Sequence, residues 1–376
     1  MTGVTETGRP AGSAPGTGGP GRSGAPVPVS VTRRTRGRVW LWAVALGAAL
    51  AASVVAAVTI GPAGLAPADV VASIAAHLGI GEPTLSPLRD GIVWELRMPR
   101  VLTAAAVGAG LALCGAVMQA LTRNPLADPY LLGLSSGASV GAVIVIVLGV
   151  GLLLPLAAFA GALAALVATL ALAGAAGRGA GGSGGGLSPT RTVLAGLAVS
   201  SMFGAITSLV IFWSATGDSY REILNWLLGS LAGTDWVSVA IAGGALLAIG
   251  IPLVASARTL DAFAFGDAAA SALGVHVGRS RVLLLGGTAL LTGALVAVSG
   301  SIGFIGLILP HGVRLLVGSR HRALLPLSAL AGALFLVWAD TAARTLFDPR
   351  ELPVGIITAL VGGPVFALLL MRRRVS

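Results

Sequence analysis

The sequence predicts an all-α protein that crosses a membrane many times. Hydrophobic residues make up 55% of its 376 residues and charged residues only 10%, whereas soluble proteins carry about 25% charged residues. The apolar residues fall into runs of about twenty, which is the length of helix needed to cross the hydrocarbon layer of a bilayer. Most arginines lie between these runs, as expected for the loops of a membrane protein.

Ten apolar runs fit membrane-spanning helices. The first run, from Val39 to Ile60, is too long for the hydrophobic part of a signal peptide, so we expect an uncleaved helix. Shorter helices are expected outside the spans, at Pro67 to Leu78 and at Tyr220 to Leu228. The expected spans are 39–60, 93–121, 130–150, 152–176, 191–213, 237–256, 281–300, 303–318, 323–342 and 353–371.

Charge at the two ends of the chain predicts its orientation. Residues 1–37 are rich in Gly, Pro, Ser and Thr and finish in an arginine cluster, which predicts a disordered cytoplasmic tail before a transmembrane domain at 38–376. The C-terminal run Arg372-Arg373-Arg374 predicts a cytoplasmic C-terminus. An even number of spans satisfies both ends, and the Gly-rich stretch 177–186 becomes a cytoplasmic link.

Alternation of the spans places two groups of arginines on opposite sides. Arg97 and Arg100 open the second span and face outward, although arginine is normally kept in the cytoplasm. A partner must therefore hold them there. The expected cytoplasmic arginines are 123, 178, 258, 279, 281, 320 and 322, and the expected outer ones are 89, 97, 100, 221, 344 and 350.

Residue types that are missing exclude several functions. All 24 basic residues are arginine, so the chain lacks the lysine of a phosphate-binding P-loop and the amine of Schiff-base catalysis. Cys114 is the single cysteine, which excludes an intrachain disulfide and indicates a small packed side chain. The four histidines show no metal-ligand spacing, and the arginines follow the spans rather than forming a nucleic-acid-binding patch.

Small residues recur in the third span. Gly133, Gly137 and Gly141 are spaced by four, which favours close approach of helix backbones. The same stretch matches the G-x-S-x-G pattern of hydrolases at Ser135, but no strand precedes it and no His–Asp pair is evidently placed to activate the serine. Helix packing is therefore favoured over a membrane-embedded hydrolase.

The span interiors carry almost no charge. Asp340 lies four residues before Arg344, which predicts an ion pair within one helix, and Arg314 lies near an inner span end where it can extend to the membrane surface. Ion-coupled transporters usually place Asp, Glu or His in their spans. A secondary transporter or channel working alone is therefore the weaker alternative, and a conduit driven by other subunits fits better.

The cytoplasmic loop at about 258–281 is long and contains apolar residues. Phe263 to Gly274 predicts two short helices broken at Gly266. Exposed apolar residues on a cytoplasmic element suggest a docking surface for a protein partner. The alternative is a helix that lies on the lipid surface.

In several places the residues resemble one family, the FecCD-type permeases of bacterial ABC importers for iron–siderophores, haem and vitamin B12. The resemblance covers residues 40–374 in order. It rests on Arg97-Met98-Pro99-Arg100, Gly115–Gln119, Asn124–Pro129, Leu132–Ala138, Gly266-Asp267, Leu273-Gly274, Gly303–Leu307, Pro310-His311, Arg314-Leu315, His321-Arg322, Leu325-Pro326, Ala339-Asp340, Glu351–Gly355 and Gly362–Pro364.

The resemblance implies roles for particular residues at the two ends of the spans. Arginines at the outer mouth of such permeases receive acidic residues of a substrate-binding protein, and the matching positions are Arg97, Arg100 and Arg344. The cytoplasmic loop of the family docks on the ATPase. Its matching residues are Phe265, Gly266, Asp267, Ala270, Leu273 and Gly274, with Asp267 in place of the commoner Glu, so the acidic charge is retained and we expect coupling to survive.

The resemblance also implies the assembly and the pathway. It predicts a multi-pass cell-membrane subunit with ten spans in a type II importer architecture, paired with a second permease subunit, a substrate-binding protein and two ATPase subunits. No cofactor is expected on this chain, since the partner ATPase uses the ATP. The expected pathway residues are Ser200, Ser201, Ser208, Gly355 and Gly362. Iron–siderophore is the first choice of cargo, ahead of haem and cobalamin, and an ABC exporter leaves the outer arginines without a partner.

Overall fold

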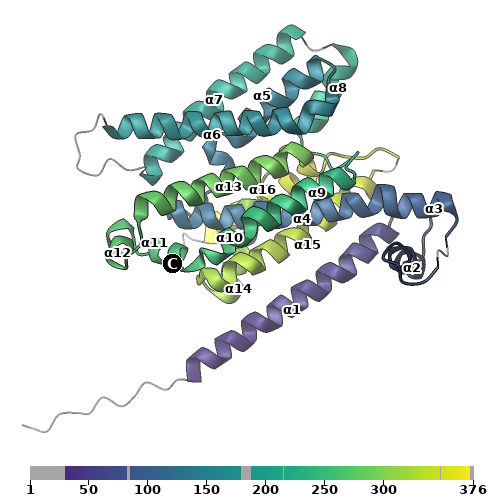
Figure 1. Ribbon diagram of the computed structural model, residues 1–376, viewed down its shortest axis with the longest axis horizontal. Helices are drawn as coiled ribbons and strands as arrows, with labels where there is room; N and C mark the ends of the chain where they lie inside the picture. The colour runs from purple at the N-terminus through teal and green to yellow at the C-terminus, as the bar shows by residue number, and fades with distance from the viewer. Residues whose placement is uncertain (1–29, 83–84, 179–187, 215, 348, 373–376) are drawn as a thin grey trace, which may run out of the picture.

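The computed structural model describes residues 30–82, 85–178, 188–214, 216–347 and 349–372, and these residues form helices joined by short loops (Figure 1). The described ranges contain no β-strand. Most of the expected tail at 1–37, most of the Gly-rich link at 177–186 and Arg373-Arg374 lie outside the described residues. The first helix begins at Ser30, so the last part of the expected tail is helical.

The helices follow the expected order along the chain. The N-terminal part contains α1 (Ser30–Thr59), α2 (Pro67–His77), α3 (Pro87–Gly91), the π-helical turn η1 (Ile92–Arg97), α4 (Met98–Thr122), the 3-10 turn η2 (Pro129–Leu132) and α5 (Leu134–Val147). The middle part contains η3 (Gly151–Leu153), α6 (Leu154–Arg178), α7 (Pro189–Ser214), α8 (Gly217–Leu227), α9 (Trp236–Ala245), η4 (Leu246–Gly250) and α10 (Ile251–Ala255). The C-terminal part contains α11 (Ala257–Phe263), α12 (Asp267–Ala272), α13 (Val277–Ser299), α14 (Ile305–Val317), α15 (His321–Thr345) and α16 (Val354–Arg372).

Each of the ten expected spans coincides with a helical stretch. Seven stretches in the described residues are long and apolar enough to cross a membrane. The stretches α5, α14 and the apolar part of α16 are shorter, so their crossing stays a prediction. The expected short helices at 67–78 and 220–228 are present as α2 and α8.

Helix α4 is the centre of the larger helix group, and nearly all of it is buried (Figure 1). Its small residues allow the neighbouring backbones to come close. A Cβ at Gly108 would lie 2.2 Å from the carbonyl oxygen of Gly332 on α15, and a Cβ at Gly332 would lie 2.2 Å from that of Gly108. The two helices therefore cross at a mutual glycine contact, which is how small residues drive helix association where lipid supplies no hydrophobic force.

Helices α5, α6, α7 and α8 form a second group beside this centre (Figure 1). Gly137 and Gly141 pack against α6, where added Cβ atoms would lie 2.3 Å and 2.0 Å from the carbonyl oxygens of Gly161 and Ala157. The packing expectation holds for these two residues. Gly133 precedes α5 in a left-handed conformation (φ 80°) instead of lying on a face of that helix, and it packs against α7, where a Cβ would lie 3.2 Å from Val199.

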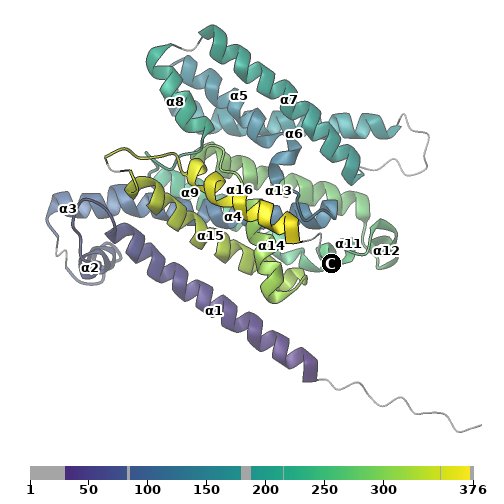
Figure 2. The ribbon, with the colours of Figure 1, turned by 180° about the vertical axis from the view of Figure 1, so that it is seen from behind.

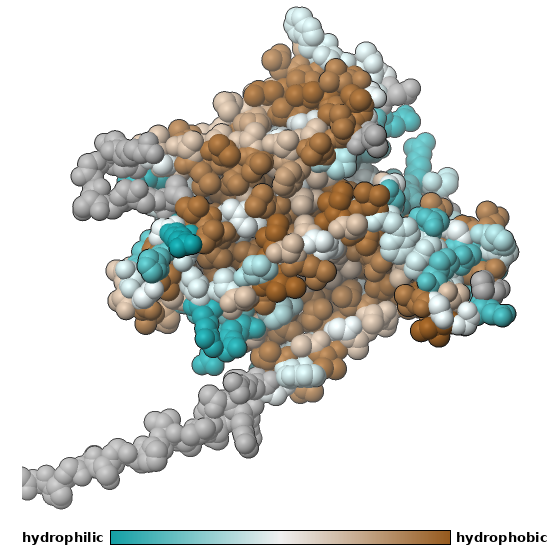
Figure 3. Space-filling view, viewed as in Figure 1, coloured by the Kyte–Doolittle hydropathy of each residue, from teal (hydrophilic) through white to brown (hydrophobic). Residues whose placement is uncertain are grey.

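The surface divides into an apolar belt between two polar ends. Figure 3 shows hydrophobic residues across the middle of the molecule and hydrophilic groups gathered at the end with α2 and α3 and at the end with α12. We call the end that carries α2, Arg97 and Arg344 the outer end, and the end that carries α11 and α12 the inner end. This pattern is the one that a lipid bilayer imposes on a helical membrane protein.

Candidate functional site

At the outer end, two arginines bind the C-terminal carbonyls of α1. Arg97 Nη1 donates to the carbonyl oxygens of Val58 at 2.7 Å and Thr59 at 3.1 Å. Arg344 donates to the carbonyl of Ile60 at 3.0 Å and also to that of Ala57. The last carbonyls of a helix lack partners within the helix and carry partial negative charge, so the guanidinium groups satisfy and neutralise them. The end of α1 is thereby fastened to η1 and α15.

A buried carboxylate completes this cluster. Asp340 is 1% exposed and accepts from Arg100 Nε and Nη2 at distances between 2.9 and 3.1 Å. Arg100 Nη1 also donates to Glu351 at 2.7 Å. The expected pair within α15 is the longer contact, with Arg344 Nε 3.9 Å from the Asp340 carboxylate. The main partner of Asp340 is therefore Arg100 of α4, and such a forked, charge-assisted pair fixes both position and orientation.

The three arginines assigned to binding-protein docking thus already have partners within the chain. Arg97 is buried, and the side chains of Arg100 and Arg344 are 13% and 8% exposed. Their docking role stays a prediction. Exposed arginines at the outer end are Arg89, Arg221 and Arg350; sequence reasoning placed them outside but, without a motif around them, gave them no role.

At the inner end there are two short helices, α11 and α12, and α12 projects from the bundle (Figure 1). α12 lies within the stretch predicted from the sequence, whereas α11 lies before that stretch and ends at Phe263. Gly266 joins them with φ 93°, and a Cβ there would lie 3.2 Å from Arg123 Nη1. Phe265 and Leu273, on either side of α12, are 77% and 67% exposed, whereas Ala270 is buried. Gly274 ends the element with φ 83°. The element therefore offers two apolar side chains to the outside while its inner face is packed.

Asp267, the first residue of α12, is held by Arg281 at the start of α13. Arg281 Nη1 and Nη2 donate to the two carboxylate oxygens at 3.0 and 2.7 Å. The hydrogen bonds from Arg281 hold the pKa of Asp267 below its usual value. Arg281 is buried and lies over the ring of Phe263, 5.3 Å from its centroid. Asp267 therefore orients α12 as well as adding charge to it.

A second carboxylate fastens α11 to α15. Asp261 accepts from the backbone N–H of His321 at 3.0 Å, and its carboxylate lies 2.7 Å from His321 Nδ1. The two inner helices are thus tied to α13 and α15 by separate carboxylates. Because α15 also carries Asp340 and Arg344, one helix of 25 residues, about 36 Å long, connects the inner element to the outer cluster.

Sequence reasoning gave no role to Arg281 or Asp261. Asp267 and Arg281 are 14 residues apart in the sequence, and Asp261 and His321 are 60 residues apart, so folding brings each pair together. The motifs of the resemblance marked Asp267 and His321, but not their partners Arg281 and Asp261. Arg314 also differs from expectation, because it donates to Gln119 Oε1 at 3.1 Å on α4 instead of extending to the membrane surface.

The five expected pathway residues lie in different environments. Ser201 and Ser208 on α7 are exposed, and Ser200 is half-buried. Gly355 packs on the α8–α9 loop, where a Cβ would lie 1.9 Å from the carbonyl of Leu228, and Gly362 packs on Phe304. Both glycines therefore act at least as packing residues. Ser135, which matched the hydrolase pattern, has its hydroxyl 2.7 Å from that of Ser301.

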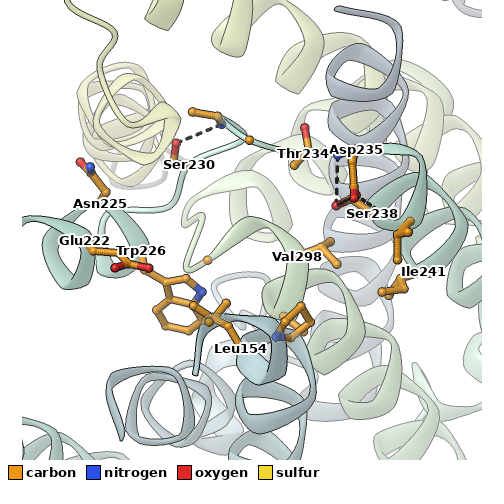
Figure 4. A pocket seen from close by; sticks show the side chains of 17 residues that line it. Leu154, Glu222, Asn225, Trp226, Ser230, Thr234, Asp235, Ser238, Ile241 and Val298 are labelled. Atoms are coloured by element: carbon orange, nitrogen blue, oxygen red, sulfur yellow. Dashed lines mark hydrogen bonds between the residues drawn. The ribbon is translucent and has the colours of Figure 1, made fainter. Parts of the chain in front are cut away.

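A cavity of about 610 Å³ with both polar and apolar lining residues opens beside α8 and α9 (Figure 4). Glu222 and Asn225 come from α8, and Asp235 caps α9 by accepting from the Ser238 N–H at 2.9 Å. Asp235 also accepts from the Ser238 hydroxyl, and the two hydrogen bonds from Ser238 lower the pKa of the Asp235 carboxyl. The cavity therefore presents carboxylates, an amide and hydroxyls rather than the arginines expected to face a binding protein.

The architecture and the two ends define the class: a multi-pass membrane permease whose inner end carries a projecting docking element. The FecCD transport family matches residues 41–372 of the chain. The chain belongs to this family, and it is a permease subunit of an ATP-binding-cassette importer in the cell membrane. Like its relatives it is a transport subunit, and ATP hydrolysis in such systems belongs to partner subunits.

The chain is similar to named permeases over most of its length. It is 44% identical to YvrB of Bacillus subtilis, an uncharacterized ABC transporter permease protein, over 305 residues, which cover 79% of this chain and 84% of YvrB. It is 40% identical to the cobalamin import system permease protein BtuC of Halobacterium salinarum, with 91% and 99% covered. It is 42% identical to the hemin transport system permease protein HmuU of Yersinia pestis, with 75% and 84% covered.

A solved structure has the same fold. The inward-facing conformation of a metal-chelate type ABC transporter superposes with a TM-score of 0.74 at 32% identity, covering 88% of this chain and 98% of that one. The family assignment therefore rests on sequence and structure together.

Proposed function

We propose that this chain forms the translocation pathway of an importer for a metal chelate, and that the cargo is an iron–siderophore complex. The relatives named for hemin and cobalamin, and the metal-chelate type transporter of the same fold, support the class of cargo. The expected pathway helices are α7 and α16. Apart from Arg191 near the start of α7 and Arg372 at the end of α16, they contain no charged residue. This suits a bulky chelate that carries little exposed charge. Haem and cobalamin are the alternative cargoes.

The assembly that we propose has two permease subunits, two ATPase subunits and a substrate-binding protein, with both termini of this chain in the cytoplasm. Figure 2 shows α16 and α7 facing the same side of the molecule. Exposed apolar residues on these helices, among them Leu209, Phe212 and Leu360, support this side as the contact with the second permease subunit. The exposed arginines at the outer end support docking of an acidic substrate-binding protein at that end.

The inner element carries the proposal for energy coupling. Phe265 and Leu273 are exposed on a helix whose base is fixed by the Asp267–Arg281 and Asp261–His321 pairs. A force on these two side chains passes through the pairs into α13 and α15, because both pairs join rigid helices. Closure of the ATPase dimer on ATP then shifts α15 and, with it, the outer cluster around Asp340. This chain supplies the conformational change and the partner supplies the chemistry.

The test is transport and ATP hydrolysis measured together in proteoliposomes that contain the permease, its ATPase and the binding protein. Phe265→Asp with Leu273→Asp should abolish uptake and remove the stimulation of ATP hydrolysis by loaded binding protein. The matched control is Leu78→Asp with Ile80→Asp, which places the same two charges on residues that are 67% and 68% exposed at the outer end. Normal coupled uptake by the Phe265 and Leu273 double variant would overturn the assignment of this element.

Uptake by vesicles that contain the permease alone would instead favour a secondary transporter. Cargo is tested in the complete system with three labelled chelates: a ferric siderophore, haem and cobalamin. Saturable, ATP-dependent uptake of the ferric siderophore alone is the expected result. Transport of haem or cobalamin in its place would retain the importer and replace the cargo.

A further inference from the structure

A long apolar groove runs along the face of the molecule opposite α16. It has a volume of about 610 Å³ and lies between α1, α4, the η4–α10 stretch and α15. Its lining includes small residues, among them Ala105, Ala109 and Ala333, and larger ones such as Leu50 and Leu330. All fourteen lining residues are Ala, Gly, Leu, Ile, Val or Pro. Because it lies within the apolar belt, the groove opens to lipid and not to water.

The inner end of this groove meets two arginines. A second cavity of about 350 Å³ shares Val254 with the groove and is lined also by Ala255, Ala257, Arg258 and Arg322. Both arginines are exposed. Within the part of the chain that the structure describes, neither guanidinium takes part in a hydrogen bond or an ion pair. Arg322 lies one helical turn before the groove residue Pro326 on α15, so the positive charge and the apolar groove share one face.

The dimensions of the groove match one leaflet of a bilayer. From Arg322 to Ala333, α15 rises about 16 Å at 1.5 Å per residue, and the hydrocarbon core of a bilayer is about 30 Å thick, or roughly 15 Å per leaflet. A molecule whose anionic head binds the two arginines would therefore extend its tail to about the middle of the membrane.

We propose that this groove and the Arg258–Arg322 pair form a binding site for one anionic phospholipid, with the phosphate between the guanidinium groups and an acyl chain along the groove. Guanidinium groups bind phosphate through paired N–H donors, and basic pockets beside transmembrane helices recognise anionic headgroups. The orientation that the proposed function assigns makes this the cytoplasmic leaflet. The site itself requires only that both arginines lie at the same membrane surface.

The charge at the inner end of the groove favours a lipid over an apolar protein segment. The two exposed arginines match an anionic headgroup, and the fourteen apolar residues match the acyl chain attached to it. The faces assigned to a second permease subunit, α7 and α16, lie on the other side (Figure 2). A flexible hydrocarbon chain is therefore the occupant that fits.

The test is native mass spectrometry of the full-length permease, titrated in detergent with phosphatidylglycerol or with phosphatidylcholine of the same chain length. The unmodified chain should bind one phosphatidylglycerol in preference to phosphatidylcholine. Arg258→Gln with Arg322→Gln should weaken phosphatidylglycerol binding about 30-fold, because each arginine near the membrane surface contributes about fivefold. The control pair Arg191→Gln with Arg279→Gln removes the same charge at the inner end but away from the groove, and should bind as the unmodified chain does.

A second variant tests the apolar part of the site. Ala329→Leu fills the groove from α15 without touching either arginine and should reduce phosphatidylglycerol binding even if the arginine variant fails to fold. Equal binding of both lipids by the unmodified chain, or unchanged binding by the two variants, would overturn the proposal. So would a second copy of the chain displacing the lipid. The measurement uses neither ATPase nor cargo. A negative lipid-binding result therefore leaves the proposed importer function standing, and a negative transport result leaves the lipid site standing.

Discussion

The Arg100–Asp340 pair gives the sharpest stability prediction. Asp340 is 1% exposed and accepts three hydrogen bonds from Arg100. Asp340→Ala removes the buried anion that Arg100 and Arg344 share and leaves Arg100 with Glu351, whose side chain is 48% exposed, as its acidic partner. Removing one partner of a buried ion pair costs about 3–5 kcal/mol when the remaining charge is left unpaired, and the remaining Glu351 contact places the expected cost at the lower end of that range. We expect a loss of that size in the free energy of unfolding.

The assay is unfolding of the purified chain in mixed micelles by a denaturing detergent, followed by the change in helical circular dichroism. The matched variant is Arg100→Leu with Asp340→Leu, which removes both charges and should recover part of the loss, since an apolar pair often replaces a buried ion pair at little cost; Arg344 still lacks the Asp340 carboxylate in it. A loss below about 1 kcal/mol for Asp340→Ala, or a double variant no more stable than the single one, would refute the reasoning.

Three further predictions concern other parts of the molecule. Gly108→Ala should cost about 1–3 kcal/mol or more, because its Cβ would lie 2.2 Å from the Gly332 carbonyl, whereas Gly47→Ala has open space and should be neutral in the same unfolding assay. Asp267→Asn should lower the thermal midpoint equally at pH 5 and pH 8. The folded protein lowers the pKa of Asp267, so the stabilisation from this carboxylate is complete above the unfolded value of about 3.9 and is lost only as the pH falls through the folded pKa. A difference between the effects at the two pH values would contradict this. Arg221→Glu with Arg350→Glu should weaken binding of the substrate-binding protein in a salt-sensitive manner, measured by surface plasmon resonance on permease in nanodiscs, and unchanged affinity would remove these exposed arginines from the docking surface.

The positions of the helices could be predicted from the sequence, because the thickness of a bilayer sets the length of an apolar run that crosses it. Every expected span coincides with a helical stretch, and α12 lies where the loop pattern predicted a short helix after Gly266, whereas the helix before it, α11, ends at Phe263, where the predicted stretch begins. Exact boundaries were less accessible. The third span begins at Leu134 instead of residue 130, because Asp128 accepts from the Tyr130 N–H and starts a 3-10 turn that ends at Gly133.

Side-chain partners could not be read from the sequence. Local spacing suggested that Asp340 pairs with Arg344, four residues away, but the crossing of α4 and α15 brings Arg100 closer. In the same way, the resemblance marked Arg97 as a residue for an outside partner, while the structure shows it bound to the end of α1. An arginine motif predicts that a partner exists, and only the packed fold shows that the first partner is the chain itself.

The central claim is that the α11–α12 element receives the ATPase, and cysteine accessibility tests it most directly. Cys114 is the only cysteine of the chain and is buried, so Leu273→Cys introduces a single reactive thiol, on a residue 67% exposed. Phe347→Cys, at a residue 58% exposed at the outer end, is the control. A membrane-impermeant maleimide should label both variants in the isolated permease, and binding of the ATPase should slow labelling at position 273 alone. Equal labelling at position 273 with and without bound ATPase would contradict the account.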